Sequence, residues 1–273
     1  MIGAIIGDIC GSVYEWHPVK TTQCQLFASD AFFTDDSVHT IAVATAFMDT
    51  WGREDDDADL KYEAIGKMLR YYTLLYPGRG YGGSFLEWAM SANPKPYNSF
   101  GNGSAMRVSS VGWMFDSLEE TLLMAQFSAA PTHNHEEGVA GAQATAGAIY
   151  LARTGHSKDV IRDFVQNQMD YNMNRTIAGI RPHYTYDVTC QGSVPESILA
   201  FLESESFEDC IRIAISLGGD ADTQAAIAGS IAEAYYGVPD WMREKAVAML
   251  DEPLRMQLDR FEKKYRKARH AFI

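Results

Sequence analysis

The stretch "LGGDADTQAAIAGSIAEAYYG", residues 217–237, combines two glycines, two aspartates and a run of small residues. Alanine, glycine and serine recur at three- and four-residue spacing after Thr223, which predicts a helix over 223–236 that neighbouring helices approach closely. Asp220 and Asp222 stand where this helix begins. Carboxylates at the start of a buried helix either cap its free N–H groups or face a positive partner, because an unpaired buried charge is costly.

Helical periodicity extends from this stretch over most of the chain, and strand-like alternation is scarce. It is weak even in "RPHYTYDVTC", residues 181–190, which we interpret as an extended loop. We therefore expect an all-α, compact single domain over residues 1–273. The predicted helices are 38–50, 56–76, 118–129, 137–154, 157–170, 195–204, 207–217, 223–236, 239–250 and 252–270.

The composition is that of a globular protein, with 47% apolar and 22% charged residues among 273. A net charge of −13 argues against nonspecific binding to nucleic acid or to an anionic membrane. The N-terminal apolar run lacks leading basic residues and meets Asp8 early, so it predicts neither a signal peptide nor a membrane span. The cysteine spacings match no zinc pattern, and Cys10 and Cys210 are expected to be buried free thiols in a cytoplasmic protein.

A second acidic helix start, "FFTDDSVHT" at residues 32–40, resembles the first one. Thr34, Asp35 and Asp36 precede an apolar helical pattern, and taken alone they suit helix capping. Two such starts together offer carboxylate and hydroxyl oxygens, which suit Mg²⁺, Mn²⁺ or Ca²⁺ rather than zinc. The metal ligands predicted from the two clusters are Thr34, Asp35, Asp36, Asp220, Asp222 and Thr223.

The N-terminal stretch "GDICGSVYEWHP", residues 7–18, contains two further carboxylates. Glu15 lies between Tyr14 and Trp16, and a carboxylate among aromatic rings can position or deprotonate water. Asp8 is interpreted either as a catalytic group or as a polar side chain inside a helix that backbone groups satisfy.

Glycine-rich turns at 77–85 and 96–113 can bring backbone N–H groups close to an anion, through Gly101, Gly103 and Ser104 in the second turn. The second turn lacks the GKS/T ending of a P-loop, and Phe100 offers a stacking surface for a base. In "PTHNHEEG", residues 131–138, His133 either contacts a ligand or belongs to a helix start capped by Thr132 or Asn134.

These motifs occur together in a known family. "GDICGSVYE", "FTDDSVHT", "RGYGGSF", "GNGSAMR", "PTHNHEEG" and "LGGDADT" resemble, in order and rough spacing over residues 2–237, the ADP-ribosylglycohydrolases. The resemblance implies an orthogonal all-α bundle, two Mg²⁺ ions (or Mn²⁺) at the two acidic clusters, and catalytic roles for Glu15, Asp36 and Asp222. It implies substrate binding by Gly80, Tyr81, Gly82, Asn98, Ser99, Phe100, Gly101, Gly103, Ser104 and His133, the last near the adenosine half.

The resemblance also implies a reaction, the hydrolysis of the glycosidic bond between ADP-ribose and an acceptor. "GSVYEWH" is similar to the serine-hydrolysing branch, so we expect an O-linked adduct to be preferred. The expected partners of this monomer are ADP-ribosylated proteins or small ADP-ribose conjugates, and an ADP-ribosylated nucleic acid also fits. A Mg²⁺-dependent diphosphate enzyme is disfavoured because its D-D-x-x-D pattern fails at His39. A catalytically silent relative would be expected to lose a ligand, and none is missing here.

Overall fold

The computed structural model describes residues 1–50 and 58–266, with only the backbone described for residues 58–61 and 266. The described chain is helical, which confirms the all-α prediction, and its one β feature is an isolated bridge between Gly101 and Thr189. The helices are α1 Ile2–Gly11, α2 Asp35–Thr50, α3 Ala58–Leu75, α4 Gly83–Met90, α5 Gly103–Met106, α6 Val111–Met114, α7 Leu118–Ala129, α8 Glu136–Arg153, α9 Lys158–Gln168, α10 Ile177–Ile180, α11 Cys190–Glu203, α12 Phe207–Ile215, α13 Ala221–Tyr236, α14 Asp240–Met249 and α15 Glu252–Phe261, followed by a π-helical turn, Glu262–Arg266.

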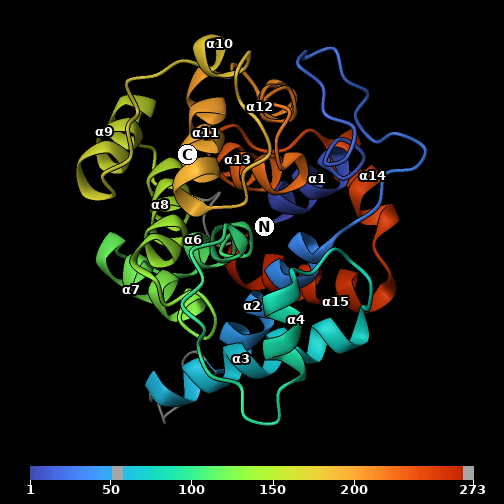
Figure 1. Cartoon of the computed structure of the whole chain (residues 1–273), viewed down its shortest axis with the longest axis vertical. Coiled ribbons are helices and arrows are strands. Elements are labelled where there is room, and N and C mark those ends of the chain that lie inside the picture. The colour runs from blue at the N-terminus through green and yellow to red at the C-terminus, as the bar shows by residue number, and fades with distance from the viewer. Residues whose placement is uncertain (51–57, 267–273) are drawn as a thin grey trace.

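The central pair of the fold is α1 and α13, which run antiparallel and side by side (Figure 1). Three glycines of α1 make the close approach possible. A Cβ atom on Gly3 would lie 2.3 Å from the carbonyl oxygen of Gly229, and one on Gly7 would lie 2.0 Å from that of Ala225. A Cβ on Gly11 would lie 2.4 Å from the Cα of Asp222, so the end of α1 is pressed against the acidic start of α13.

The remaining helices surround this pair in two groups (Figure 1). In one group α11 and α12 pack on α13, and α8 packs on both α11 and α13 while α7 covers it. In the other group α2 packs on α1, with α3 and α15 against its outer side. The buried hydrophobic side chains of both groups form one connected core, which leaves the N-termini of α2 and α13 facing each other.

The helix predictions miss α1 and α4, together with the one-turn helices α6 and α10. Helix α1 was not predicted, because it is buried on every side and therefore has no polar face to give a period. Helix α11 begins five residues before the predicted position 195, because Thr189 accepts a capping hydrogen bond from Gly192 N (3.1 Å) and Pro195 is accommodated inside the helix. The ends of two predicted helices, at 56–57 and 267–270, lie outside the described residues.

Across the part of the chain that is described, no helix combines the length and the apolar character needed to cross a membrane. All four cysteines, including Cys10 and Cys210, are free and buried, as predicted for these two.

Candidate functional site

A cavity of about 760 Å³ opens where the N-termini of α2 and α13 meet the loop after α1. It gathers residues from seven separate stretches of sequence, within 15–16, 32–39, 78–85, 97–107, 133, 186–189 and 220–223. The predicted site residues that line it are Glu15, Thr34, Asp35, Asp36, Gly80, Gly82, Asn98, Ser99, Phe100, Gly101, Gly103, His133, Asp220, Asp222 and Thr223. Tyr81 and Ser104 are not among its lining residues. The Tyr81 hydroxyl donates to the Tyr76 carbonyl (2.8 Å), and the Ser104 hydroxyl donates to the Gly138 carbonyl (2.6 Å).

The start of α2 is held in place by Asp8 of α1, which is completely buried. One Asp8 carboxylate oxygen accepts hydrogen bonds from the backbone N–H (3.2 Å) and the hydroxyl (2.7 Å) of Thr34. The other accepts from the backbone N–H of Ser37 (3.0 Å) and from its hydroxyl. Of the two interpretations of Asp8, the structure supports the second, a buried polar side chain whose hydrogen bonds are made by neighbouring groups. Through these hydrogen bonds Asp8 fixes the start of the helix that carries Asp35 and Asp36.

The start of α13 is held by contacts to two other stretches. Asn102 donates from its amide to Asp220 Oδ2 (2.7 Å), and the Thr223 hydroxyl reaches Asp36 Oδ2 (3.3 Å), which directly joins the two acidic clusters. Asp220 occupies the N-cap position of α13 but makes no side-chain capping hydrogen bond. The capping interpretation is therefore wrong for this side chain, which is directed to the cavity.

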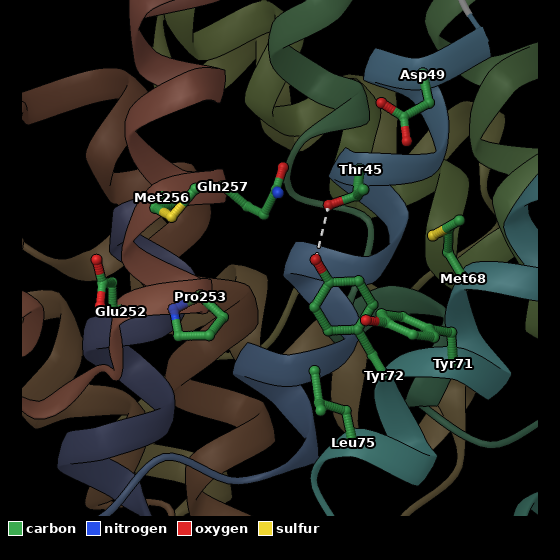
Figure 2. Close-up of a pocket in the computed structure, with 10 residues that line it drawn as sticks. All are labelled: Thr45, Asp49, Met68, Tyr71, Tyr72, Leu75, Glu252, Pro253, Met256 and Gln257. Carbon is green, nitrogen blue, oxygen red and sulfur yellow. Dashed lines mark hydrogen bonds between the residues drawn. The ribbon is translucent and has the colours of Figure 1, made fainter.

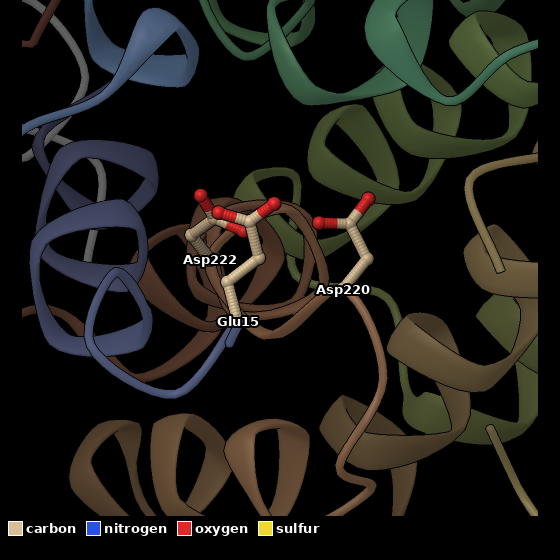
Figure 3. A group of neighbouring side chains, drawn as sticks. All are labelled: Glu15, Asp220 and Asp222. Atoms are coloured by element: carbon tan, nitrogen blue, oxygen red, sulfur yellow. The ribbon is translucent and has the colours of Figure 1, made fainter. Parts of the chain in front are cut away.

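Glu15 completes the acidic group from the loop after α1 (Figure 3). Carboxylate oxygens of Glu15, Asp220 and Asp222 all lie within 4.8 Å of one another, and Figure 3 shows the Glu15 and Asp222 groups directed at each other with Asp220 across from them. The Tyr186 hydroxyl donates to Glu15 Oε1 (3.1 Å), and the Tyr186 ring stacks on Trp16 with centroids 6.0 Å apart.

The electrostatics of this group are unfavourable without a positive partner. Burial and repulsion from Asp222 raise the pKa of Asp8 and of Glu15 to about 7 in each case. The same two causes raise the pKa of Asp35, Asp36 and Asp220 well above the ordinary value. None of the ion pairs in residues 1–50 and 58–266 involves these carboxylates.

The donor set fits a divalent cation on its own chemistry. Asp36 Oδ1 is buried with no hydrogen-bond partner, although buried carboxylate oxygens are normally satisfied. The converging donors are carboxylate and hydroxyl oxygens, the ligands that Mg²⁺ and Mn²⁺ prefer. A cation bound between α2 and α13 would supply the charge compensation that no ion pair of the described residues provides to these carboxylates.

The two glycine-rich turns both line the cavity. Gly80 has φ +106°, and a Cβ there would lie 2.9 Å from Asp35 Oδ1, so both its backbone conformation and its position require glycine. In the other turn Phe100 is 45% exposed beside the His135 ring, with centroids 5.4 Å apart. The cap of α8 is His135, whose Nδ1 accepts from Glu137 N (3.1 Å), rather than Thr132 or Asn134 as the sequence suggested.

Sequence reasoning missed several residues of this cavity, namely Asn102, Tyr186, Arg79, Arg107, Val188 and Thr189. Asn102 could have been found, because it lies between Gly101 and Gly103 in a turn already singled out. The Arg79 guanidinium lies over the Phe33 ring (3.9 Å) and donates to the Phe33 carbonyl (3.1 Å), so a cation does lie in the wall beside the glycine turn. No sequence signal connects Tyr186 with Glu15.

A second cavity, of about 530 Å³, lies between α2, α3 and α15 (Figure 2). Its lining is mostly apolar and aromatic, and the Thr45 and Tyr72 hydroxyls are hydrogen-bonded there (3.3 Å). Its two carboxylates, Asp49 and Glu252, lie far apart in Figure 2, and Asp49 is paired with Arg260 (2.7 Å). This cavity has no converging polar groups, so the acidic cavity is the candidate site.

Fold and site together define an all-helical protein whose cavity combines two aspartate clusters with glycine turns. Over residues 1–270 the sequence matches the model of the ADP-ribosylglycohydrolase family, and the chain belongs to this family. Members of the family are hydrolases that act on ADP-ribosyl linkages.

Individual relatives agree with this assignment. The chain is 26% identical to ADP-ribosylhydrolase ARH3 of Mus musculus over 87% of this chain and 83% of that protein. It is 22% identical to the ADP-ribosylarginine hydrolase Tri1 of Pseudomonas putida, over 94% and 76%. A solved ADP-ribosylglycohydrolase-related protein complex has the same fold, with a TM-score of 0.67 and 22% identity over 95% of each chain.

Proposed function

We propose that this protein is a metal-dependent hydrolase that cleaves the glycosidic bond between ADP-ribose and an acceptor and releases ADP-ribose. The observation that carries the proposal is the convergence of Asp35 and Asp36 with Asp220 and Asp222 beneath Glu15, without a cationic partner among the described residues. Membership of the family and the likeness to ARH3 support the substrate class.

The cofactor we propose is a pair of Mg²⁺ ions, with Mn²⁺ as the alternative, held by Thr34, Asp35, Asp36, Asp220, Asp222 and Thr223. Bound there, the ions supply Lewis acidity toward a ribose oxygen or a water molecule. The contact of 3.3 Å between the Thr223 hydroxyl and Asp36 Oδ2 supports a centre that takes ligands from both helices.

The protein's own groups bind the substrate and move the proton. Glu15 is suited to hold a proton near the reacting bond, because burial and the neighbouring Asp222 raise its pKa to about 7. The glycine turns at Gly80 and at Gly101–Gly103 leave room for the pyrophosphate and sugars, and Phe100 offers an exposed ring to the adenine. In this proposal the anomeric carbon lies between Glu15 and the aspartates.

The acceptor we propose is an O-linked group, such as ADP-ribosylated serine in a protein. The stretch "GSVYEWH" is similar to the serine-hydrolysing branch. A guanidinium acceptor would need an acidic group of its own, and in the described cavity Glu15 is the only carboxylate not already assigned as a metal ligand. A catalytically silent relative is disfavoured, because each of the six positions expected to bind metal carries a side-chain oxygen.

One assay tests the proposal. Matched peptides carrying ADP-ribosyl-serine or ADP-ribosyl-arginine, and an ADP-ribosylated oligonucleotide, are incubated with the protein, with Mg²⁺ or with excess EDTA, and free ADP-ribose is measured. We expect release that requires the metal and a higher kcat/KM on the serine peptide. Release in EDTA that matches release in Mg²⁺ would overturn the metal dependence. A tenfold preference for arginine would overturn the acceptor assignment, and no release from any substrate would overturn the hydrolase.

A further inference from the structure

A buried chain of three polar side chains lies behind the glycine turn of the cavity. Arg107, at the end of α5, is completely buried, and its Nη2 donates to the Thr132 hydroxyl (2.8 Å) and to the Ser128 carbonyl (3.0 Å). The same Thr132 oxygen lies 2.7 Å from Nδ1 of His133, which is only 5% exposed. Arg107 and His133 both line the cavity.

The chemistry of this chain fixes the direction of each hydrogen bond. A guanidinium donates and cannot accept, and Arg107 stays charged at neutral pH because burial lowers its pKa only to about 10. The Thr132 oxygen therefore accepts from Arg107, and among the described residues the only acceptor within hydrogen-bond distance of the Thr132 hydrogen is Nδ1 of His133. Nδ1 of His133 must then be the acceptor, so the ring proton lies on Nε2.

The charge of the ring follows from the same surroundings. Burial, and then the positive charge of Arg107, lower the pKa of His133 well below its ordinary value. An imidazolium would also bring a second proton to Nδ1, where the Thr132 hydrogen already points. The arrangement favours a neutral ring with a single N–H.

That N–H faces the cavity across the glycine turn. A Cβ on Gly103 would lie 3.1 Å from Nε2, and one on Gly101 would lie 3.6 Å away. Within the described chain, Nε2 has no hydrogen-bond partner. The absence of side chains at the two glycines leaves the Nε2–H group accessible to whatever occupies the cavity.

We propose that Arg107 and Thr132 are positioning residues that hold His133 as a neutral Nε2–H donor, which recognises a hydrogen-bond acceptor atom of the bound nucleotide. That the bound molecule is a nucleotide rests on the proposed function, whereas the tautomer of His133 does not. The site thereby selects for an acceptor at this position and against a ligand N–H group.

The tautomer is tested directly by nitrogen NMR on the full chain labelled with ¹⁵N-histidine, with His133 assigned by the signal lost in His133→Gln. We expect an unprotonated Nδ1 and a protonated Nε2 at neutral pH. A protonated Nδ1 in the wild-type protein would overturn the proposal, whatever ligand the cavity binds.

Two substitutions at Thr132 test the positioning role. Thr132→Val removes the hydroxyl at nearly constant shape, and Thr132→Ser keeps it. We expect Thr132→Val to mix the two tautomers and to weaken ADP-ribose binding about 2- to 10-fold, the usual range for one neutral hydrogen bond, and Thr132→Ser to retain wild-type behaviour in both measurements. Thr145→Val is the matched control, since the buried Thr145 hydroxyl bonds only the Gly141 carbonyl of its own helix (3.0 Å).

The outcomes separate the two hypotheses. A Thr132→Val protein with the wild-type tautomer and an unchanged dissociation constant would overturn the positioning role. Wild-type protein that binds no ADP-ribose in calorimetry would instead contradict the proposed function, while the tautomer is still decided by the NMR signals. If Thr132→Val does not fold, the wild-type spectrum together with Thr132→Ser decides the proposal.

Discussion

Tyr186 donates a hydrogen bond of 3.1 Å to Glu15, a residue 171 positions earlier in the sequence. The Tyr186 phenol remains a donor at neutral pH, because burial and the nearby carboxylates raise its pKa. The contact also connects the loop after α1 with the extended loop before α11, and the stacking of Trp16 on Tyr186 reinforces it. Glu15 is thereby held close to Asp222 and Asp220.

We predict that Tyr186→Phe lowers kcat on an ADP-ribosyl-serine peptide by about 3- to 30-fold with little change in KM. The reason is that a hydrogen bond to an ionisable group contributes on the order of 1–2 kcal/mol, while the phenyl ring keeps the stack on Trp16. Glu15→Gln should lose about 10²- to 10⁴-fold, the usual contribution of a proton-transfer group. Adding Tyr186→Phe to Glu15→Gln should change kcat no further, and a full additive loss would show that Tyr186 acts elsewhere.

The second prediction concerns the metal ligands. Asp36→Asn and Asp222→Asn should each weaken Mg²⁺ or Mn²⁺ binding and lower turnover by about 10²-fold or more, because each removes a charge at the centre. Calorimetric titration with the metal and an initial-rate assay measure the two effects. Asp163→Asn, on the exposed face of α9, is the matched control and should resemble wild type. Two cluster variants with wild-type metal affinity would show that the acidic groups do not form one centre.

The sequence was sufficient for the fold class and for both acidic clusters, because helical periodicity and paired motifs are local signals. It was not sufficient for α1, whose fully buried surface has no amphipathic period, or for the role of Asp8. Tyr186 reaches Glu15 only through tertiary packing, which no local pattern encodes. Tyr81 was proposed from its motif, yet its hydroxyl bonds the Tyr76 carbonyl inside the core.

The packing of α1 against α13 gives a third prediction, on stability. Gly7→Ala would place a Cβ 2.0 Å from the Ala225 carbonyl oxygen, so the two helices must separate. We expect a loss of at least about 1–3 kcal/mol in the free energy of unfolding, as for other overpacked sites. Urea unfolding measures this loss, and Gly82→Ala is the control, because no atom lies within 4 Å of the Cβ it adds. Equal midpoints for the two variants would contradict the close packing.

The raised carboxylate pKa values predict how the stability of the metal-free protein, kept in EDTA, depends on pH. Asp8 and Glu15 have ordinary pKa values of 3.8 and 4.5 that rise to about 7 in the folded protein. Folding therefore favours their protonated forms, and this contribution is complete below about pH 4 and is lost as the pH rises through 7. In EDTA the melting temperature should be higher at pH 5 than at pH 8.

Divalent metal should reverse this trend, because it binds the ionised carboxylates. We expect Mg²⁺ or Mn²⁺ to raise the melting temperature strongly at pH 8 and little at pH 5, as measured by thermal unfolding with and without the metal. Glu15→Gln should reduce the pH dependence of the melting temperature in EDTA. If wild-type protein in EDTA became more stable from pH 5 to pH 8, this would contradict the raised pKa values of Asp8 and Glu15.

The last prediction concerns the exposed ring of Phe100. The ring is 45% exposed at the cavity and leans on His135 at 5.4 Å, so one face is supported while the cavity side remains free to stack on a base. Phe100→Ala should weaken ADP-ribose binding by about 0.5–1.5 kcal/mol beyond the loss of buried area, about 2- to 10-fold or more in Kd, while metal affinity stays unchanged. Tyr71→Ala is the matched control, because Tyr71 is 55% exposed but lines the other cavity (Figure 2). Calorimetry with ADP-ribose separates the two variants, and an unchanged Kd for Phe100→Ala would show that the adenine binds elsewhere in the cavity.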